Sequence, residues 1–498
     1  MPEPTGHAAV TTADPSATTA SARPPRLGRD PLIAVYAFLL AAFLIPGRMI
    51  VEPLGALGNP ATLIALSAAL LYGLARLIGG HLAEGRQPMR TMFVVFGTVA
   101  LIAYLSAHLR PLSAGEAAGA ERAVFNVIAV LGLGLLTADA VRDKDHLERL
   151  LRLVVAGAAV FAFMGVLQWV TGLGPTSYVL IPGLTLQDVD INVERSDFTR
   201  VQSTALHPIE FGVVLAVTLP LALHFALMGR NGRRPSMWNW VPVFMILFAI
   251  PLAVSRASVL GVAVAGIVAG VAWSWRVRLN ALFAAGLILL AMRAAFPGVL
   301  GTLVSTFLFF GEDPSIEGRT QDYPRAIAYI SERPWFGRGL GTFTPEQYFF
   351  LDNEYLGQIL TGGVVAVLTM AALFLVAMGL GRGVYHHSRD PWARSLGQSL
   401  TAATAVSAVT WFTYDGMAFR LNAGLAFVLM GATAALWRLE VGRLRWGDMA
   451  DRSRPVQFEE DLDVRAWSED PAAPREDVLH AGPSMPAAGA GGGTSRTA

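Results

Sequence analysis

The chain has 498 residues, of which 53% are hydrophobic and only 15% are charged, with a net charge of +1. Soluble globular domains carry about 25% charged residues, so this composition excludes an ordinary soluble fold of this length. The sequence contains no cysteine, which excludes disulfides, thiolate catalysis and cysteine-ligated metals.

Apolar runs of about 17 to 25 residues recur along the chain, and this is the length needed to cross about 30 Å of hydrocarbon. The fold class that they predict is an all-α integral membrane protein with about 12 transmembrane helices. Run length and flanking charge place the spans at 31–47, 59–78, 91–107, 123–141, 151–171, 208–228, 238–255, 257–275, 279–296, 355–380, 397–414 and 418–437.

Positive charge is concentrated in alternate loops. With the N-terminus inside, the arginine-rich loops near 79–90, 141–152, 229–237, 276–278 and 382–395 all face the cytoplasm. This pattern predicts a multi-pass protein of the cytoplasmic (inner) membrane with both termini in the cytoplasm.

The same topology divides the chain into a polar N-terminal tail, residues 1–30, a membrane domain, residues 31–438, and a C-terminal tail, residues 439–498. The tails are too polar and too rich in Pro, Ala and Gly to bury a core, so we expect them to be disordered. The first tail shows no cleavable signal peptide. Two long loops, 172–207 and 297–354, are expected outside the cytoplasm.

The first polar feature on that outer side is RVQSTALHPIEFG, which leads into the sixth span. It brings Arg200, His207 and Glu210 to the outer end of the span, and Pro208 suits a first helical turn. An ordinary helix entry is one interpretation, and contact with an anionic substrate is the other.

The second feature is Arg256 in a very tight turn between the seventh and eighth spans, beside Ser255. An arginine with almost no loop must lie near the apolar boundary. It either reaches to the interface with its long side chain or binds a phosphate, because a guanidinium offers two parallel hydrogen bonds to phosphate oxygens.

The third feature is the segment 319–341. Helical spacing of apolar residues predicts a short amphipathic helix at 323–332 on the outer face, starting near Pro324, with Arg319 and Arg325 flanking its beginning. Arg338 follows in a glycine-rich turn that lacks the strand context of a nucleotide-binding fingerprint. Ion pairs within the loop are the alternative explanation for these charges.

The fourth feature is Asp352-Asn353-Glu354 at the mouth of the tenth span. Charge at a membrane edge is costly unless it is paired or used. Two carboxylates in this position suit a general base or a cation site, whereas a solvated helix cap is the simpler explanation.

These residues resemble the O-antigen ligase and O-antigen polymerase superfamily of bacterial polytopic membrane glycosyltransferases. The resemblance extends from about Pro31 to Leu439. It is strongest over Arg319–Gly363, where RPWFGRGLGTF is followed by a polar pair and YLGQILTGGVVAV. It implies a GT-C-like architecture and does not separate a ligase from a polymerase.

One departure from the ligase pattern concerns the base. Ligases of this family carry a histidine directly before the asparagine of this late span, and here that position is Asp352. We therefore expect Asp352 to be the general base, with Glu354 and His207 as alternatives.

The resemblance implies a donor glycan carried on a polyprenyl diphosphate such as undecaprenyl diphosphate, a glycan or lipid acceptor, and transfer or polymerisation at the outer face of the membrane. Other envelope polysaccharide assembly proteins are candidate partners, and nucleic acid is not. Guanidinium groups would stabilise the departing diphosphate, so neither a metal nor a cofactor is expected. The candidate diphosphate-binding residues are Arg200, Arg256, Arg319, Arg325 and Arg338.

A transporter or flippase of lipid-linked glycan is the competing interpretation, and a non-catalytic scaffold of an envelope assembly complex is a third. Transporters usually keep ionisable residues near the bilayer midplane and are built from repeats. In this sequence the notable charges lie at the outer edge and no fixed-period repeat is visible.

Overall fold

The computed structural model describes residues 30–442, except 79–81, 84, 188–193, 196–197, 230–234, 296–313 and 346. For residues 194, 195, 198, 199, 288, 289, 291, 292, 295 and 314–322 only the backbone is described. The predicted disordered tails, apart from Asp30 and residues 439–442, and the first part of the loop 297–354 lie outside these residues.

The described chain is almost entirely helical. Its α-helices are α1 (Ile33–Leu44), α2 (Pro60–Leu77), α3 (Pro88–Ala107), α4 (Ala114–Ala140), α5 (Lys144–Thr171), α6 (Pro208–Leu227), α7 (Trp240–Ala249), α8 (Arg256–Gly270), α9 (Trp275–Ala295), α11 (Pro314–Glu332), α12 (Glu354–His387), α13 (Pro391–Thr410) and α14 (Arg420–Glu440). Short 3-10 helices are η1 (Glu52–Gly58), η2 (Pro175–Ser177), η3 (Met237–Asn239) and η4 (Ile250–Ala253). Two antiparallel ladders pair β1 (Met49–Ile50) with β2 (Thr185–Leu186), and β3 (Glu194–Arg195) with β4 (Phe198–Thr199).

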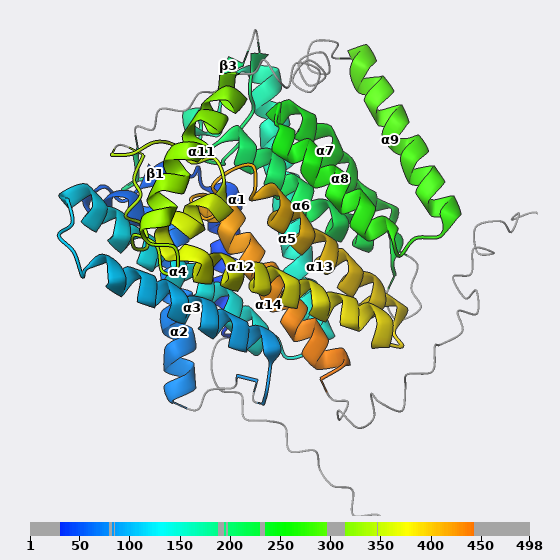
Figure 1. Cartoon of the computed structure of the whole chain (residues 1–498). Coiled ribbons are helices and arrows are strands. Elements are labelled where there is room, and N and C mark those ends of the chain that lie inside the picture. The colour runs from blue at the N-terminus through cyan, green and yellow to red at the C-terminus, as the bar shows by residue number, and fades with distance from the viewer. Residues whose placement is uncertain are drawn as a thin grey trace, which may run out of the picture. The chain divides into compact units, whose positions relative to one another are not determined.

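The predicted fold class, an all-α integral membrane protein, is confirmed. Each of the twelve predicted apolar runs coincides with a helix, the seventh being divided between α7 and η4. Among the described residues, seven helices are long and apolar enough to cross a membrane, namely α2, α3, α4, α5, α6, α12 and α14. Figure 1 shows α12, α13 and α14 side by side, as their contacts require.

Polar residues directly before the helices explain where several of them begin. The Asn59 side chain accepts a hydrogen bond from the Ala61 N–H, with Pro60 as the first residue of α2. Ser113 and Glu116 form a reciprocal capping box at the start of α4. Such caps satisfy N–H groups that have no partner inside the helix.

Small residues allow the central helices to approach closely. A Cβ on Gly431 of α14 would lie 2.4 Å from the Gly134 carbonyl oxygen of α4. A Cβ on Gly381 of α12 would lie 2.8 Å from the Gly397 carbonyl oxygen of α13. Packing of this kind is typical of membrane helices, which associate through close backbone contact rather than through hydrophobic burial.

The predicted outer segments come together at one end of the bundle, which we call the loop end. Here the Gly47 N–H donates to the Thr204 carbonyl, the Ser203 N–H donates to the Gln168 side chain, and the Glu354 N–H donates to the Trp411 carbonyl. Because the His207 and Phe419 rings also lie 6.1 Å apart, segments 200–207, 334–353 and 411–419 share one end. The predicted alternation of the spans is consistent with this arrangement.

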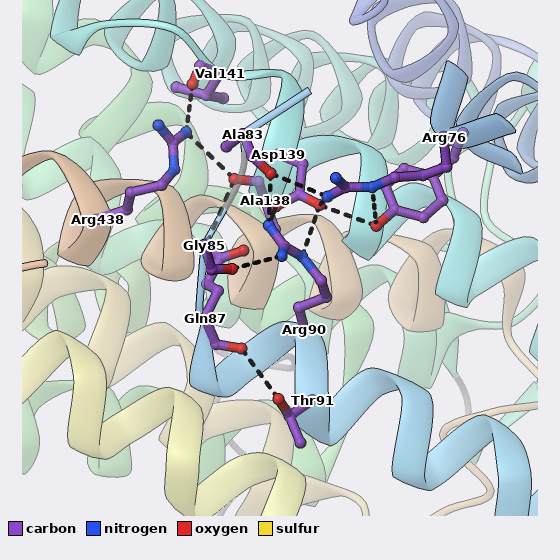
Figure 2. A network of polar contacts seen from close by, with 11 residues as sticks. Arg76, Ala83, Gly85, Gln87, Arg90, Thr91, Ala138, Asp139, Val141 and Arg438 are labelled. Carbon is purple, nitrogen blue, oxygen red and sulfur yellow. Dashed lines mark hydrogen bonds and ion pairs between the residues drawn. The ribbon is translucent and has the colours of Figure 1, made fainter. Parts of the chain in front are cut away.

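A buried charge cluster holds the opposite end together (Figure 2). Asp139, near the end of α4, has a fully buried side chain that forms ion pairs with Arg76 of α2 and Arg90 of α3. The two Arg90–Asp139 hydrogen bonds are 2.6 and 2.9 Å long. Arg438 of α14 donates to the Val141 carbonyl just beyond the end of α4. The Asp139 carboxylate thus joins α2, α3 and α4, and the hydrogen bond from Arg438 to Val141 connects α14 to the same end.

Helix α12 is broken at Gly363, whose φ of 71° and ψ of −171° are accessible to glycine and hardly to other residues. The loop 334–339 takes over the hydrogen bonds that the helix loses there. The Arg338 and Gly339 N–H groups donate to the Leu360 and Thr361 carbonyls, both at 2.9 Å, and the Val364 N–H donates to the Pro334 carbonyl at 2.8 Å. We call this arrangement the α12 break. It fixes the glycine-rich loop against the membrane domain.

The helix predicted at 323–332 is present, but its predicted start near Pro324 is wrong. Helix α11 begins earlier, at Pro314, and Pro324 lies inside it. A first-turn signature was misleading here because the preceding polar residues are also helical.

Candidate functional site

The segment 200–207 is fixed from both sides before α6 begins. The buried Arg200 donates through Nε to the Ala253 carbonyl at 3.1 Å, and the Val201 N–H donates to the Leu252 carbonyl. Ser203 adopts a left-handed φ of 54°, and its hydroxyl donates to the Phe161 carbonyl at 2.8 Å. Because these bonds come from α5 and from the turn before α8, the loop has one defined position.

His207 is the residue that caps α6. Its Nδ1 accepts the Ile209 N–H at 3.1 Å, and Pro208 is the first residue of the helix, as predicted. The ring lies 6.1 Å from the Phe419 ring, centroid to centroid. Burial, and then the nearby Arg200 guanidinium, lower the pKa of His207 to about 4, with Asp352 opposing the shift. Arg200 and Asp352 therefore both lie close enough to His207 to act on it electrostatically.

Arg256 is the first residue of α8 and is half-buried. The turn before it is tight, since Val254 has a φ of 43° in the left-handed region. The carbonyl that accepts from Arg200 belongs to Ala253, in this same turn. The two arginines predicted to bind diphosphate from the sixth and eighth spans thus arise at one corner of the loop end.

The three polar residues before and at the start of α12 have different roles in the fold. Asn353 is the cap, since its side chain accepts the Leu356 N–H at 3.1 Å. Glu354 is buried, and its carboxylate accepts from the Met417 N–H at 2.9 Å and from the Gln358 amide at 2.7 Å. Asp352 is exposed. Of the two carboxylates, Asp352 is therefore the one that an acceptor in solution can reach.

Glu210 was noted in the sequence at the entry to the sixth span, and it is a buried anchor. Its carboxylate accepts from the Leu206 N–H at 2.9 Å and from the Asn422 N–H at 3.3 Å. Arg420, at the start of α14, lies near it and donates to the Ala56 carbonyl at 2.8 Å. Glu210 therefore ties the residue before His207 to α14.

Helix α11 carries two of the predicted arginines. Arg325 is exposed, while its neighbour Ala326 is fully buried, so α11 packs through the face that carries Ala326. Arg319 lies on the helix, and its side chain is outside the described residues.

Arg338 is held by its own loop. It donates to Glu332 at 2.9 Å and to the Tyr348 hydroxyl at 3.3 Å. Its guanidinium also lies 5.0 Å from the Tyr329 ring centroid. The Tyr348 hydroxyl in turn donates to Glu116 of α4. These contacts make Arg338 a link between α11 and α4.

Sequence reasoning missed the segment 411–419 between α13 and α14. It contributes the Trp411 and Tyr414 carbonyls that accept from the Glu354 N–H, and Asp415, whose carboxyl lies against that of Glu354. The Tyr414 side chain is buried, and its ring lies 5.6 Å from the Phe419 ring. The only sequence signal was the presence of Asp415 and Arg420 between two apolar spans.

Two cavities among the described residues are not lined by Arg200, His207, Arg256 or Asp352. One, of about 20 Å³, is lined by Glu210, Arg420, Asn59 and the end of α1, and is large enough for little more than a water molecule. The other, of about 190 Å³, is apolar and lies between α1 and α5. Among the described residues, no group of three or more His, Asp or Glu side chains could hold a metal ion.

A family model described as O-antigen ligase matches residues 241–371. The matched segment includes Arg256, all of α11, the glycine-rich loop, Asp352 and the α12 break, whereas Arg200 and His207 precede it. No match to a curated protein was found. The resemblance to the O-antigen ligase and polymerase superfamily is thus confirmed for this segment. The match supports a membrane glycosyltransferase-like role in polysaccharide assembly.

Proposed function

We propose that this chain, whose residues 241–371 match the O-antigen ligase family, transfers or polymerises a polyprenyl-diphosphate-linked glycan onto a glycan or lipid acceptor. The reaction would take place at the outer face of the cytoplasmic membrane, with both termini in the cytoplasm. The observation that carries the proposal is that Arg200 and Asp352 both lie near enough to His207 to act on it at the loop end, and that Arg200 donates to Ala253 in the turn before Arg256.

The proposed chemistry is a displacement at the anomeric carbon of the donor glycan. The acceptor hydroxyl oxygen forms the new glycosidic bond, the bond from that carbon to the phosphate oxygen breaks, and the polyprenyl diphosphate leaves with the electron pair. Asp352 takes the hydroxyl proton. Its exposure supports this role over Glu354, which is buried.

Guanidinium groups would stabilise the charge that grows on the departing diphosphate. Arg200 and Arg256 are the candidates at the loop-end corner, and Arg319 and Arg325 on α11 are further candidates. A well-placed donor to a developing charge typically contributes about 10²–10³ in kcat. We expect no metal to be required, so activity should persist in excess chelator.

The decisive experiment supplies purified protein in detergent with a lipid-linked glycan and an acceptor. New glycosidic bonds are expected. A chain that instead moves the lipid-linked glycan across liposomes without forming bonds would be a flippase, and a chain that does neither would be a scaffold. Either result would overturn the proposal.

The arginine assignment needs a matched control. Arg256→Ala and Arg319→Ala should each lower kcat about 10²-fold at equal protein level. Arg152→Ala removes a partly exposed arginine that pairs with Glu148 on α5, at the cytoplasmic end by the predicted topology, and it should leave kcat near the wild-type value. If Arg256→Ala and Arg319→Ala both retained near-normal turnover, these arginines would not hold the diphosphate.

A further inference from the structure

The His207 side chain already has a structural task as the cap of α6. Its Nδ1 lone pair accepts the Ile209 N–H, which is one of the N–H groups at the start of α6 without a helical partner. A neutral imidazole has one N–H and one lone pair, so the nitrogen that accepts fixes the position of the proton. The ring proton of His207 is therefore on Nε2, and Nδ1 is not available as a base.

The surroundings also disfavour a doubly protonated ring. Protonation at Nδ1 would break the cap and place a positive charge at the positive end of the α6 dipole. The Arg200 guanidinium is a second positive charge nearby, whereas Asp352 is the only described carboxylate that favours the charged ring. Glu210, on the same helix, has its carboxylate turned to the Leu206 and Asn422 N–H groups.

The position of the ring is well defined. Glu210 holds the residue before it, Arg200 and Val201 hold the start of the loop, and Phe419 of the 411–419 segment lies 6.1 Å away. Within the described part of the chain, no residue accepts a hydrogen bond from Nε2. A neutral N–H donor is therefore fixed beside a guanidinium, with the exposed Asp352 carboxylate nearby.

We propose that His207 is a hydrogen-bond donor to the substrate rather than a general base, and that its Nε2–H binds a phosphate oxygen of the polyprenyl diphosphate next to Arg200. Two neighbouring donors suit an anionic oxygen, whereas Asp352 is an acceptor and suits the attacking hydroxyl. This inference rests on the proposed glycan transfer, and it divides the corner into a leaving-group side and an acceptor side.

Three substitutions separate the cap from the donor. His207→Asn keeps an oxygen at the position of Nδ1, and Asn is among the best capping residues, but it loses the Nε2–H donor. His207→Gln places an amide N–H near the position of Nε2. His207→Phe removes both groups. We expect His207→Asn to unfold at the wild-type temperature while its kcat falls about 10²-fold, and His207→Gln to recover part of that loss.

The pH profile separates a donor from a base. If His207 donates, the dependence of kcat on pH between 3.5 and 9 has the same shape in wild type, His207→Asn and His207→Gln. A rate limb with a midpoint between about pH 4 and 7 in the wild type that disappears in His207→Asn would make His207 the base. Wild-type kcat in His207→Asn would show that it has no catalytic role. Either result overturns the inference.

Nuclear magnetic resonance of ¹⁵N-histidine-labelled protein in detergent gives a readout that does not depend on turnover. The spectrum of His207→Asn assigns the His207 signals by difference. We expect a protonated Nε2, an unprotonated Nδ1 at pH 7, and a downfield shift of the Nε2–H signal on adding undecaprenyl diphosphate. A proton on Nδ1, or no response to the diphosphate, would overturn the inference even if glycan transfer is observed. Absence of glycan transfer by the wild type would instead refute the proposed function, while this spectrum could still be read.

Discussion

The α12 break allows a stringent test of how the glycine-rich loop is held. A Cβ on residue 363 would lie 2.2 Å from both the carbonyl carbon and the carbonyl oxygen of Trp335. The Gly363→Ala variant must therefore either move the loop or refold this turn of the helix. A backbone conformation reserved for glycine costs roughly 1–3 kcal/mol in another residue. Each of the three short hydrogen bonds between loop and helix contributes about 0.5–1.5 kcal/mol.

Together these terms predict that Gly363→Ala destabilises the folded protein by about 2.5–7.5 kcal/mol. Gly379→Ala is the matched control in the same helix, because a Cβ at that position meets no atom within 4 Å. It should stabilise α12 by about 0.5–1 kcal/mol. Equilibrium unfolding in mixed detergent micelles measures both changes. If the two variants had equal stability, the loop would not depend on the glycine at the break.

Three further predictions concern charged groups. His207 has a pKa of about 4 in the folded protein, below the usual 6.5, so the unfolded state binds more protons between these values. Stability should therefore fall by about 2–3 kcal/mol as the pH drops from about 6.5 to about 4, and His207→Asn should show a smaller fall in the same unfolding assay. Asp139→Ala leaves Arg76 and Arg90 without their shared carboxylate and should lower the free energy of unfolding by about 3 kcal/mol. An unchanged unfolding transition would show that the cluster of Figure 2 contributes no stability. Arg338→Lys should lower the unfolding temperature with little change in kcat, because lysine cannot contact Glu332 and Tyr348 together. A fall of about 10²-fold in kcat at unchanged stability would instead support a role for Arg338 in binding diphosphate.

The positions of the helices could be predicted well from the sequence because apolar runs are long and their flanking charges are clear. The residues at which the helices begin could not be predicted from the sequence. Helix α4 begins at Ala114 and α5 at Lys144, several residues before the predicted spans. Charged residues in these first turns look like loop residues in a hydropathy pattern. In the structure Glu116 pairs with Arg110, and Lys144 pairs with Asp390 and Glu440.

The candidate site was predictable as a set of residue types and not as a set of roles. Asp352 and Glu354 are two residues apart and chemically alike, so no local pattern tells them apart. The difference involves the segment 411–419, whose Met417 N–H donates to the buried Glu354 carboxylate, whereas Asp352 is exposed. Likewise, only the contact with Ile209 distinguishes a donor from a base at His207. Such roles depend on residues that are distant in sequence or on the geometry of a single helix start.

The exchange of hydrogen bonds at the α12 break has a practical consequence for protein engineering. Residues 334–339 and 360–365 complete each other's backbone pairing, so they form one module although about twenty residues of chain lie between them. A chimera that imports the outer loop from a related sequence without the matching turn of the helix would leave amide and carbonyl groups at the α12 break without their partners. Both pieces should therefore be transplanted together.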